Sequence, residues 1–375
     1  EREREREMED NRKGNLHESY AMNGGDGTQS YVQNSSFQRS AVEAAKEIIN
    51  EEVASKLDIN KQLSSASRNA FRIADFGCST GPNTFLAVQM IIEAIEHKFE
   101  SQGLTSQLPE FQVFFNDHVL NDFNTLFVSL PPNRRYFAAG VPGSFHTLLF
   151  PKASINFAYS SSTLNWLSKV PKEVADNMSP AWNKGKIHYI GARKEVFDAY
   201  SAQFAMDMES FLNSRAHELV SGGLMALLVP AFPSLFHHPQ TNIGSEPDLL
   251  GSCLMDMAQM GLVNEEKVDS FNVPTYYTSP KELEALIKKN QNFSIERMET
   301  LQTPKKRVVV PDLKMRSSYV RAAFEGLIEK NFGSEILDEL FDRYAKKVPE
   351  SPFFSNPDNQ KTISIFVLLQ RKVDG

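Results

Sequence analysis

The stretch RIADFGCSTGPN, residues 72–83, decides the fold. Its apolar part, 72–76, ends abruptly in a loop with glycines at 77 and 81, and an apolar-periodic helix follows as far as Phe99. The glycines permit a tight turn and let a ligand approach the backbone before the helix begins. The stretch therefore predicts a strand, a ligand-binding loop and a helix, in that order.

Further apolar runs have the length expected of buried strands. They lie at 111–115 (FQVFF), 154–159 (SINFAY), 224–229 (LMALLV) and 362–369 (TISIFVLL). Helical periodicity is found at 40–57, 249–260, 280–289 and 317–344. Short apolar runs of this kind are typical of strands that are covered on both faces. We expect an α/β protein with a doubly wound, mostly parallel sheet, and ligands at the carboxyl ends of its strands.

The remaining segments set the expected domain organisation. Residues 1–7 alternate Glu and Arg without an apolar face, so we expect a disordered tail over 1–18. The helical patterns before the last strand are too long for one crossover, which indicates a helical cap inserted over the sheet. We assign 19–230 and 290–375 to the α/β domain, and 231–289 with parts of 300–360 to the cap.

Composition excludes several classes of protein. The 375 residues include 40 Lys and Arg against 47 Asp and Glu, a net charge of −7, which argues against a nucleic-acid partner. No uninterrupted apolar run approaches the ~18 residues of a membrane span. The two cysteines, Cys78 and Cys253, are too few for a disulfide-stapled secreted scaffold and are not spaced as a metal site. We expect a cytoplasmic protein without a membrane partner.

The loop at 75–81 indicates the kind of ligand. It lacks the G-x-G-x-x-G pattern of dinucleotide-binding folds, which also argues against a nicotinamide dehydrogenase. Its pattern of acid-x-Gly-x-x-x-Gly, from Asp75 to Gly81, suits a ligand without pyrophosphate, such as S-adenosylmethionine, whose amino-acid portion Asp75 can reach. Asp117, after the next strand, is placed to accept both ribose hydroxyls. A plain β–α turn and a helix cap remain the structural alternatives.

At this point the sequence resembles the plant SABATH methyltransferases, from about Met22 to Lys372. The matching motifs are Met22 to Gly25 (MNGG), Ser30-Tyr31, Asn34-Ser35, Asp75 to Asn83, Asn116-Asp117, Asn121 to Asn124 (NDFN), Gly140 to Phe145 (GVPGSF), Trp166 to Pro171 (WLSKVP), Asn183 to Gly185 (NKG) and Asp269 to Pro274 (DSFNVP). The resemblance implies a seven-stranded, Rossmann-like methyltransferase sheet with an inserted cap, and an S-adenosylmethionine-dependent carboxyl O-methyltransferase.

The resemblance also implies the cofactor site. The methionine end of the cofactor is expected against Tyr31, Ser35, Asp75, Gly77, Cys78 and Asn83. Asp117 is expected to hold the ribose, and Ser144 and Phe145 to flank the adenine, with His118 nearby. Cys78 is then part of a pocket wall, since no partner base for a nucleophilic cysteine is recognisable.

The acceptor site follows from the same resemblance. Gln38 and Trp166 match residues that bind the acceptor carboxylate, and both side chains donate hydrogen bonds. Where many relatives have Tyr and then Met or His before this Trp, the chain has Ser162 and Asn165. We therefore expect a wider and more polar pocket, and an acid larger or more polar than salicylate or benzoate. Pro247, in place of a second Trp found in some relatives, favours the same interpretation.

A metal site and a partner are implied as well. Asn183, Asp269, the backbone carbonyl of Phe271 and Asn272 match positions that can hold a structural magnesium ion, for which oxygen ligands are suitable. A network of carboxamides and carboxylate that fixes the cap is the alternative. Relatives are commonly homodimers.

The expected reaction needs no residue as a general acid or base, because a carboxylic acid of pKa ~4–5 is already ionised at pH 7. In-line transfer of the methyl group to the carboxylate of a small plant acid is expected. Two alternatives stay open. One is N-methylation of a xanthine-like ring, and the other is a cofactor-binding protein whose acceptor pocket has lost its substrate.

Overall fold

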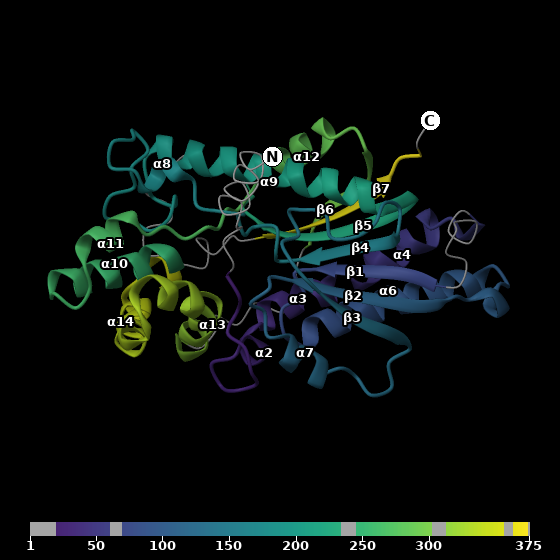
Figure 1. Cartoon of the computed structure of the whole chain (residues 1–375), viewed down its shortest axis with the longest axis horizontal. Helices are drawn as coiled ribbons and strands as arrows, with labels where there is room; N and C mark the ends of the chain where they lie inside the picture. The colour runs from purple at the N-terminus through teal and green to yellow at the C-terminus, as the bar shows by residue number, and fades with distance from the viewer. Residues whose placement is uncertain (1–19, 61–69, 234–244, 302–312, 356–362, 374–375) are drawn as a thin grey trace, which may run out of the picture.

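The structure is a computed structural model that describes residues 20–60, 70–233, 245–301, 313–355 and 363–373. Figure 1 shows a sheet with helices on both faces and a lobe of helices beside it. The tail expected over 1–18 lies outside the described residues.

The sheet has seven strands in the order β3-β2-β1-β4-β5-β7-β6. The strands are β1 (Ala70–Phe76), β2 (Glu110–Asp117), β3 (Tyr136–Pro142), β4 (Ile155–Ser161), β5 (Leu219–Ala231), β6 (Phe293–Leu301) and β7 (Ile363–Arg371). Only β7 runs antiparallel to its neighbours, so the doubly wound, mostly parallel sheet is confirmed. The strand order reverses between β1 and β4, and ligands bind at the carboxyl ends beside such a reversal.

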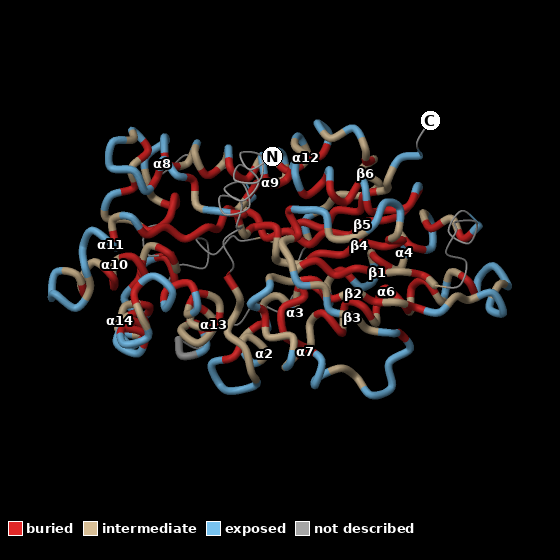
Figure 2. The backbone as a smooth tube through the Cα atoms, in the orientation of Figure 1, coloured by how far each residue is buried: buried red, intermediate tan, exposed pale blue. Residues whose placement is uncertain are grey.

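Two hydrophobic cores explain why the strands read as apolar runs. In β5, Leu224 and Leu228 join the core on one face, whereas Met225 and Val229 join the core on the other. Figure 2 shows the resulting band of buried backbone along the sheet. Removing both faces of a strand from water is the main favourable contribution to folding, at roughly 25 cal/mol per Å² of apolar surface.

Different helices cover the two faces. The first face carries α3 (Ser36–Ala44), α4 (Lys46–Lys56), α6 (Pro82–Ser101) and α7 (Phe123–Val128). The second carries the long α9 (Lys194–Glu218) and α12 (Pro280–Lys289). Thus α12, within the range that the sequence analysis assigned to the cap, packs against α9 and β6.

The lobe beside the sheet has a third core. It is built by α10 (Glu246–Gln259), α11 (Glu265–Ser270), α13 (Leu313–Phe332) and α14 (Leu337–Lys347). The continuous pattern predicted over 317–344 is two helices here. Gly333 adopts φ +92°, a left-handed conformation that glycine tolerates, and the chain turns there between α13 and α14.

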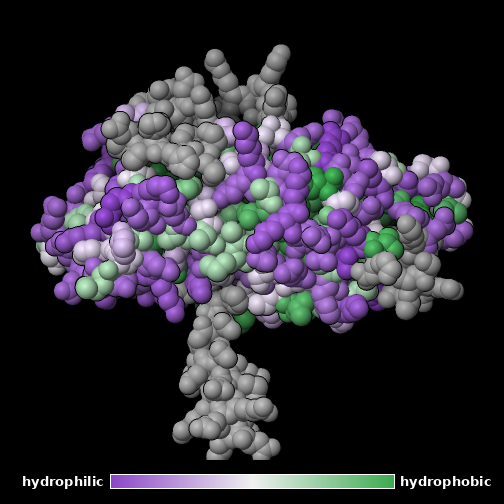
Figure 3. Space-filling model, turned by 90° about the horizontal axis from the view of Figure 1, so that it is seen from above, coloured by the Kyte–Doolittle hydropathy of each residue, from purple (hydrophilic) through white to green (hydrophobic). Residues whose placement is uncertain are grey.

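The face seen from above is largely polar. From above, Figure 3 shows hydrophilic side chains over most of the visible face, with small apolar patches between them. Across the described ranges, no helix combines the length and apolar character needed to span a bilayer.

Candidate active site

The loop after β1 is held in a conformation that only glycine can adopt at its first position. Gly77 has φ +87°, and a Cβ at this position would overlap the side chain of Thr163. The N–H groups of Gly77 and Cys78 donate to the carbonyl of Asn116 at 2.8 and 2.9 Å. The loop is thereby tied to the end of β2, at the carboxyl edge of the sheet where ligands of such folds bind.

Asp117 ends β2 with a carboxylate fixed by backbone groups. Ser79 N–H donates to its Oδ2 and His118 N–H to its Oδ1, each at 2.7 Å. Burial raises the pKa of Asp117, and His118 and the two N–H donors oppose this rise. Each carboxylate oxygen keeps an unshared electron pair. A vicinal diol, as in ribose, can therefore donate to both oxygens.

Asp75 is the second acid at these strand ends. It is 2% exposed and accepts a hydrogen bond from the hydroxyl of Thr84 in the first turn of α6. Burial raises its pKa to about 7, and the negative charge of Asp117 adds to the rise. A ligand ammonium group that reached Asp75 would relieve this penalty, since an opposite charge stabilises the carboxylate.

The segment before α3 closes one side of the loop. Asn83 Nδ2 donates to the carbonyl and to Oγ of Ser35, at 3.1 and 3.0 Å. Tyr31, in the short helix α2 (Tyr31–Asn34), lies near Asp117 and Tyr319, and burial with these neighbours raises its pKa. The structure therefore places Tyr31 near Asp117 and joins Ser35 to Asn83 at the start of α6.

The glycine pair of the MNGG motif has a steric explanation. A Cβ on Gly24 would lie 2.8 Å from Oδ2 of Asp122. The same carboxylate accepts the N–H of Gly25 at 2.9 Å and caps α7 through the N–H of Thr125 at 2.9 Å. The N-terminal segment thus docks on the loop after β2.

Gln38 joins the first long helix to the cap. Its Nε2 donates to the hydroxyl of Tyr319 in α13 at 3.3 Å. Its Oε1 is buried and has no hydrogen-bond partner among the described residues. Since the amide has two N–H groups, one remains for a ligand.

Trp166 lies where the cap meets the sheet. Its ring stacks on Tyr20 and tilts against Phe324, with centroid distances of 6.1 and 5.6 Å. An isolated bridge joins its backbone to Thr275. Within the described ranges, the indole N–H of Trp166 makes no hydrogen bond, so this donor can serve a ligand.

The two residues that the sequence analysis expects to widen the acceptor pocket, Ser162 and Asn165, lie shortly before Trp166 in the chain. Ser162 adopts φ +55°, and its N–H donates to the carbonyl of Leu228 at 2.8 Å. A left-handed non-glycine residue is strained, and such residues concentrate at functional sites. Asn165 is 6% exposed, and within the described part of the chain its Oδ1 has no partner.

The predicted adenine wall follows β3. Phe145 is 2% exposed, and its ring lies 6.2 Å from His118, between centroids. Ser144 precedes it, and its Oγ accepts the N–H of His146 at 3.3 Å. The structure thus places His118 beside the Ser144–Phe145 segment.

Cys78 is buried beside the acids. Burial and the charges of Asp117 and Asp75 raise its pKa well above the usual range. A protonated thiol is a poor nucleophile. This agrees with its predicted place in the pocket wall.

The predicted metal residues form a hydrogen-bonded network between two loops. Asn183 Nδ2 donates to Oδ1 of Asn272 at 2.7 Å and to the carbonyl of His188 at 3.1 Å. Gly185 N–H donates to Asp269 at 2.9 Å. The carboxamide oxygen that Asn272 would offer a cation is therefore engaged, and the donor set fits a cation poorly. Among the described residues, no group of three or more His, Cys, Asp or Glu is placed to bind a metal.

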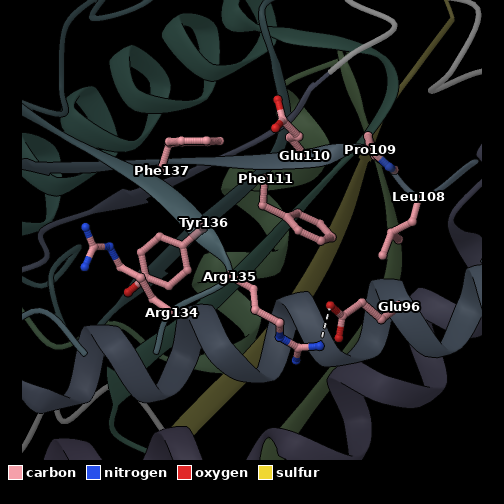
Figure 4. Close-up of a pocket in the computed structure, with 9 residues that line it drawn as sticks. All are labelled: Glu96, Leu108, Pro109, Glu110, Phe111, Arg134, Arg135, Tyr136 and Phe137. Carbon is pink, nitrogen blue, oxygen red and sulfur yellow. Dashed lines mark ion pairs between the residues drawn. The ribbon is translucent and has the colours of Figure 1, made fainter. Parts of the chain in front are cut away.

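A separate surface pocket lies far from these residues in the fold. It has a volume of about 390 Å³ and is lined at the amino ends of β2 and β3, as Figure 4 shows. Arg135 pairs with Glu96 at 2.8 Å at its edge. Because the acids above lie at the carboxyl ends of parallel strands, this pocket is at the opposite end of the sheet.

Sequence reasoning missed three residues of the site. Thr84 binds Asp75, Tyr319 binds Gln38, and Tyr20 stacks on Trp166. Thr84 could have been found from the sequence, because it is a hydroxyl residue in the first turn of the helix that follows the glycine loop, close to Asp75. No local pattern points to Tyr319 or Tyr20, because their partners are far away in the sequence.

The strand order, the glycine loop after β1 and the acid after β2 define the class of S-adenosylmethionine-dependent methyltransferases. A family model described as SAM dependent carboxyl methyltransferase matches residues 17–372. The chain belongs to this family, known as SABATH, and transfers a methyl group from S-adenosylmethionine to the carboxylate of an organic acid.

Its relatives are plant enzymes. It is 49% identical to "Loganic acid O-methyltransferase" of Catharanthus roseus over 358 residues, with 95% of each chain covered. It is 42% identical to "Farnesoic acid carboxyl-O-methyltransferase" of Arabidopsis thaliana, covering 88% of this chain and 93% of the relative. A solved structure of loganic acid methyltransferase with SAH matches with a TM-score of 0.87 and 48% identity, covering 94% and 99% of the two chains.

Proposed function

We propose that the acceptor is an acid that carries hydroxyl groups and is bulkier than benzoate, of the kind that loganic acid represents. The observation that carries this proposal is the pair of short polar side chains, Ser162 and Asn165, beside Trp166. Asn165 Oδ1 is buried with no described partner, and a hydroxyl of the substrate would supply the missing donor. The 49% identity to loganic acid O-methyltransferase supports the same class.

We propose the cofactor contacts that the family resemblance implies. Asp75, Gly77, Cys78 and Asn83 would face the amino-acid portion, together with Tyr31 and Ser35. Asp117 would hold the ribose, and Ser144, Phe145 and His118 would surround the adenine. The electron pairs that Asp117 keeps beside its two backbone N–H donors support this arrangement.

Gln38 and Trp166 would position the acceptor carboxylate. Both are neutral donors, so they can orient a carboxylate without cancelling the charge that makes it nucleophilic. S-adenosylmethionine, when bound, supplies a methyl group already activated on a sulfonium. The remaining task of the chain is to hold oxygen and methyl carbon in line at ~3–3.5 Å and to exclude water. Tyr20, Tyr319 and Phe324 would close this space from the N-terminal segment and the cap.

A methyl-transfer assay tests the proposal. The enzyme is incubated with labelled S-adenosylmethionine and, separately, loganic, farnesoic, benzoic or salicylic acid. The expected result is base-labile label with the highest kcat/KM for loganic acid. Preference for farnesoic, benzoic or salicylic acid would overturn the proposed acceptor class.

Two alternatives have distinct outcomes in the same assay. One relative, 40% identical, is "Paraxanthine methyltransferase 2" of Arabidopsis thaliana, so xanthines belong in the acceptor panel. Base-stable label on a xanthine would assign the transfer to nitrogen. Binding of S-adenosylhomocysteine with no label transferred to any acceptor would indicate a pocket that has lost its substrate.

The remaining proposals concern the assembly. We propose that the enzyme is a cytoplasmic homodimer. Cys78 and Cys253 are both free and buried, which is compatible with a reducing compartment such as the cytoplasm. Sedimentation velocity tests the dimer. We further propose that the Asn183–Asn272 network fixes the cap without magnesium. Unchanged melting temperature and activity after treatment with a chelator are then expected, and a loss restored by magnesium would contradict this.

A further inference from the structure

The buried face of α9 carries a row of polar side chains that the proposed reaction does not use. Gln203, Asp207, Ser214 and Glu218 are buried, and the exposed Ser210 continues their three- or four-residue spacing, so the five lie along one side of the helix. Figure 1 shows α9 extending from beside the cap lobe across the sheet. Polar groups on a face turned to the core need specific partners.

At its middle, this face holds the segment that carries Trp166. Oδ2 of Asp207 accepts the N–H of Ser168 at 2.8 Å, and Oδ1 accepts the hydroxyl of Ser168 at 2.7 Å. Gln203 Nε2 donates to the same Oδ1 at 2.9 Å. Asp207 is 6% exposed, and these neutral donors anchor the chain two residues beyond the indole.

At its end, the same face holds the segment that carries Ser144 and Phe145. Arg215 donates to the carbonyls of Phe145 and Thr147 at 2.6 and 2.8 Å. Ser210 Oγ donates to the intervening carbonyl of His146 at 2.7 Å. Three successive carbonyls therefore bind side chains of one helix.

The buried pair Arg215–Glu218 completes this second anchor. Its side chains are 0% and 1% exposed, and Nε of Arg215 lies 2.8 Å from Oε2 of Glu218. Oε1 of Glu218 accepts the N–H groups of Leu149 and Phe150 at 2.5 and 3.0 Å. Such a pair is costly to bury, so its full set of hydrogen bonds is what makes it tolerable.

We propose that this face of α9 positions the two ligand sites relative to each other. Asp207 holds the segment that places Trp166 against the acceptor. Arg215 and Glu218 hold the segment that places Ser144 and Phe145 against the adenine. The anchors Asp207 and Arg215 are eight residues apart, or ~12 Å along a rigid helix. Helix α9 thus fixes the spacing between adenine and carboxylate. The inference rests on the proposed roles of Trp166 and Phe145.

The test is whether the two anchors affect different ligands. The variants are Asp207→Asn and Arg215→Lys, with Glu209→Gln on the solvent side of α9 as the matched control. Calorimetry gives the Kd of S-adenosylhomocysteine and of its inosine analogue, which lacks the 6-amino group. Kinetics at saturating S-adenosylmethionine give the KM of the acid.

We expect a crossed pattern. Arg215→Lys should weaken S-adenosylhomocysteine about tenfold and reduce its preference over the inosine analogue, with the KM of the acid unchanged. Asp207→Asn should raise the KM of the acid about tenfold and leave the cofactor Kd unchanged. If Asp207→Asn does not fold, Ser168→Ala replaces it, and if Arg215→Lys does not fold, Ser210→Ala replaces it. Each of these substitutes removes fewer hydrogen bonds. The proposal would be overturned if each α9 variant shifted the cofactor Kd and the acid KM equally, or shifted neither.

Two further variants separate this inference from the proposed site roles. If Trp166→Phe and Phe145→Leu leave the acid KM and the cofactor Kd unchanged, the site roles are wrong. If these two act as proposed but the α9 variants do not, only the positioning role of α9 is wrong.

Discussion

The Nε2 of Gln38 lies 3.3 Å from the hydroxyl oxygen of Tyr319, although 281 residues separate the two in the sequence. This contact joins α3, on the sheet, to α13 in the cap. It orients the amide of Gln38 and leaves its second N–H for the proposed acceptor. The proposed acceptor side is therefore assembled from the sheet domain and the cap.

Tyr319→Phe should raise the KM of the acid about three- to tenfold, because a net hydrogen bond contributes roughly 0.5–1.5 kcal/mol. The Kd of S-adenosylhomocysteine should not change. Tyr344→Phe is the matched control, since Tyr344 is also buried in the cap and its hydroxyl has no hydrogen-bond partner among the described residues. Equal effects of the two variants would show that Tyr319 acts only through the packing of the cap.

Asp117→Ala should weaken S-adenosylhomocysteine about ten- to a hundredfold, because two charge-assisted hydrogen bonds to the ribose would be lost. Circular dichroism should show a retained fold, with Asp26→Ala at an exposed position as the control. Unchanged affinity in calorimetry would remove Asp117 from the ribose site.

Gly77→Ala should destabilise the protein by about 1–3 kcal/mol, since φ +87° is strained for a residue with a Cβ. The added methyl group would also overlap Thr163. Denaturant unfolding measures the change, and the double variant with Thr163→Gly should recover the steric part. Gly27→Ala is the control, because open space surrounds its Cβ position. A Gly77→Ala variant as stable as this control would contradict the expectation.

The affinity for S-adenosylhomocysteine should rise with pH through about 7, the pKa to which burial raises Asp75. Below that pH the carboxyl is protonated and cannot neutralise an ammonium group.

Without ligand, the titration of Asp75 affects the stability of the protein in the opposite direction. Because the pKa of Asp75 is higher in the folded protein than in the unfolded chain, the protonated carboxyl stabilises the fold. This stabilisation is full below the unfolded pKa of 3.8 and is lost as pH rises toward about 7. In Asp75→Asn both dependences should flatten. Calorimetry between pH 5.5 and 8.5, with thermal unfolding alongside, measures them.

Much of the fold could be predicted because burial leaves a plain record in the sequence. The strands buried on both faces, such as β5, read as apolar runs. The edge strand β3 has no such apolar run, because its Phe137 is 60% exposed and Gly140 and Pro142 interrupt the strand. The other edge strand, β6, is mostly half-buried and shows no clear alternation. Edge strands lack the two-sided burial that produces such runs.

The candidate site was predictable where its residues follow strand ends. Asp75 and Asp117 were placed by the rule that parallel strands deliver their carboxyl ends to one edge. The partners of Gln38 and Trp166 were not predictable, because Tyr319 and Tyr20 reach them through tertiary packing alone. Resemblance to a family supplied the roles of Gln38 and Trp166 themselves.

The bonds between the N-terminal segment and α13 have a consequence for biosynthesis. Asn23 donates to the carbonyl of Ala322 and to Glu325, so this segment is held by residues translated about 300 positions later. A nascent chain can pair β1, β2 and β4 early, but Tyr20 and Gln38 wait for α13 to emerge from the ribosome. Contacts of such long sequence separation form slowly. The proposed acceptor side is therefore completed only near the end of synthesis, and a chain that stops before α13 would lack the contacts that Tyr319 and Phe324 make with Gln38 and Trp166.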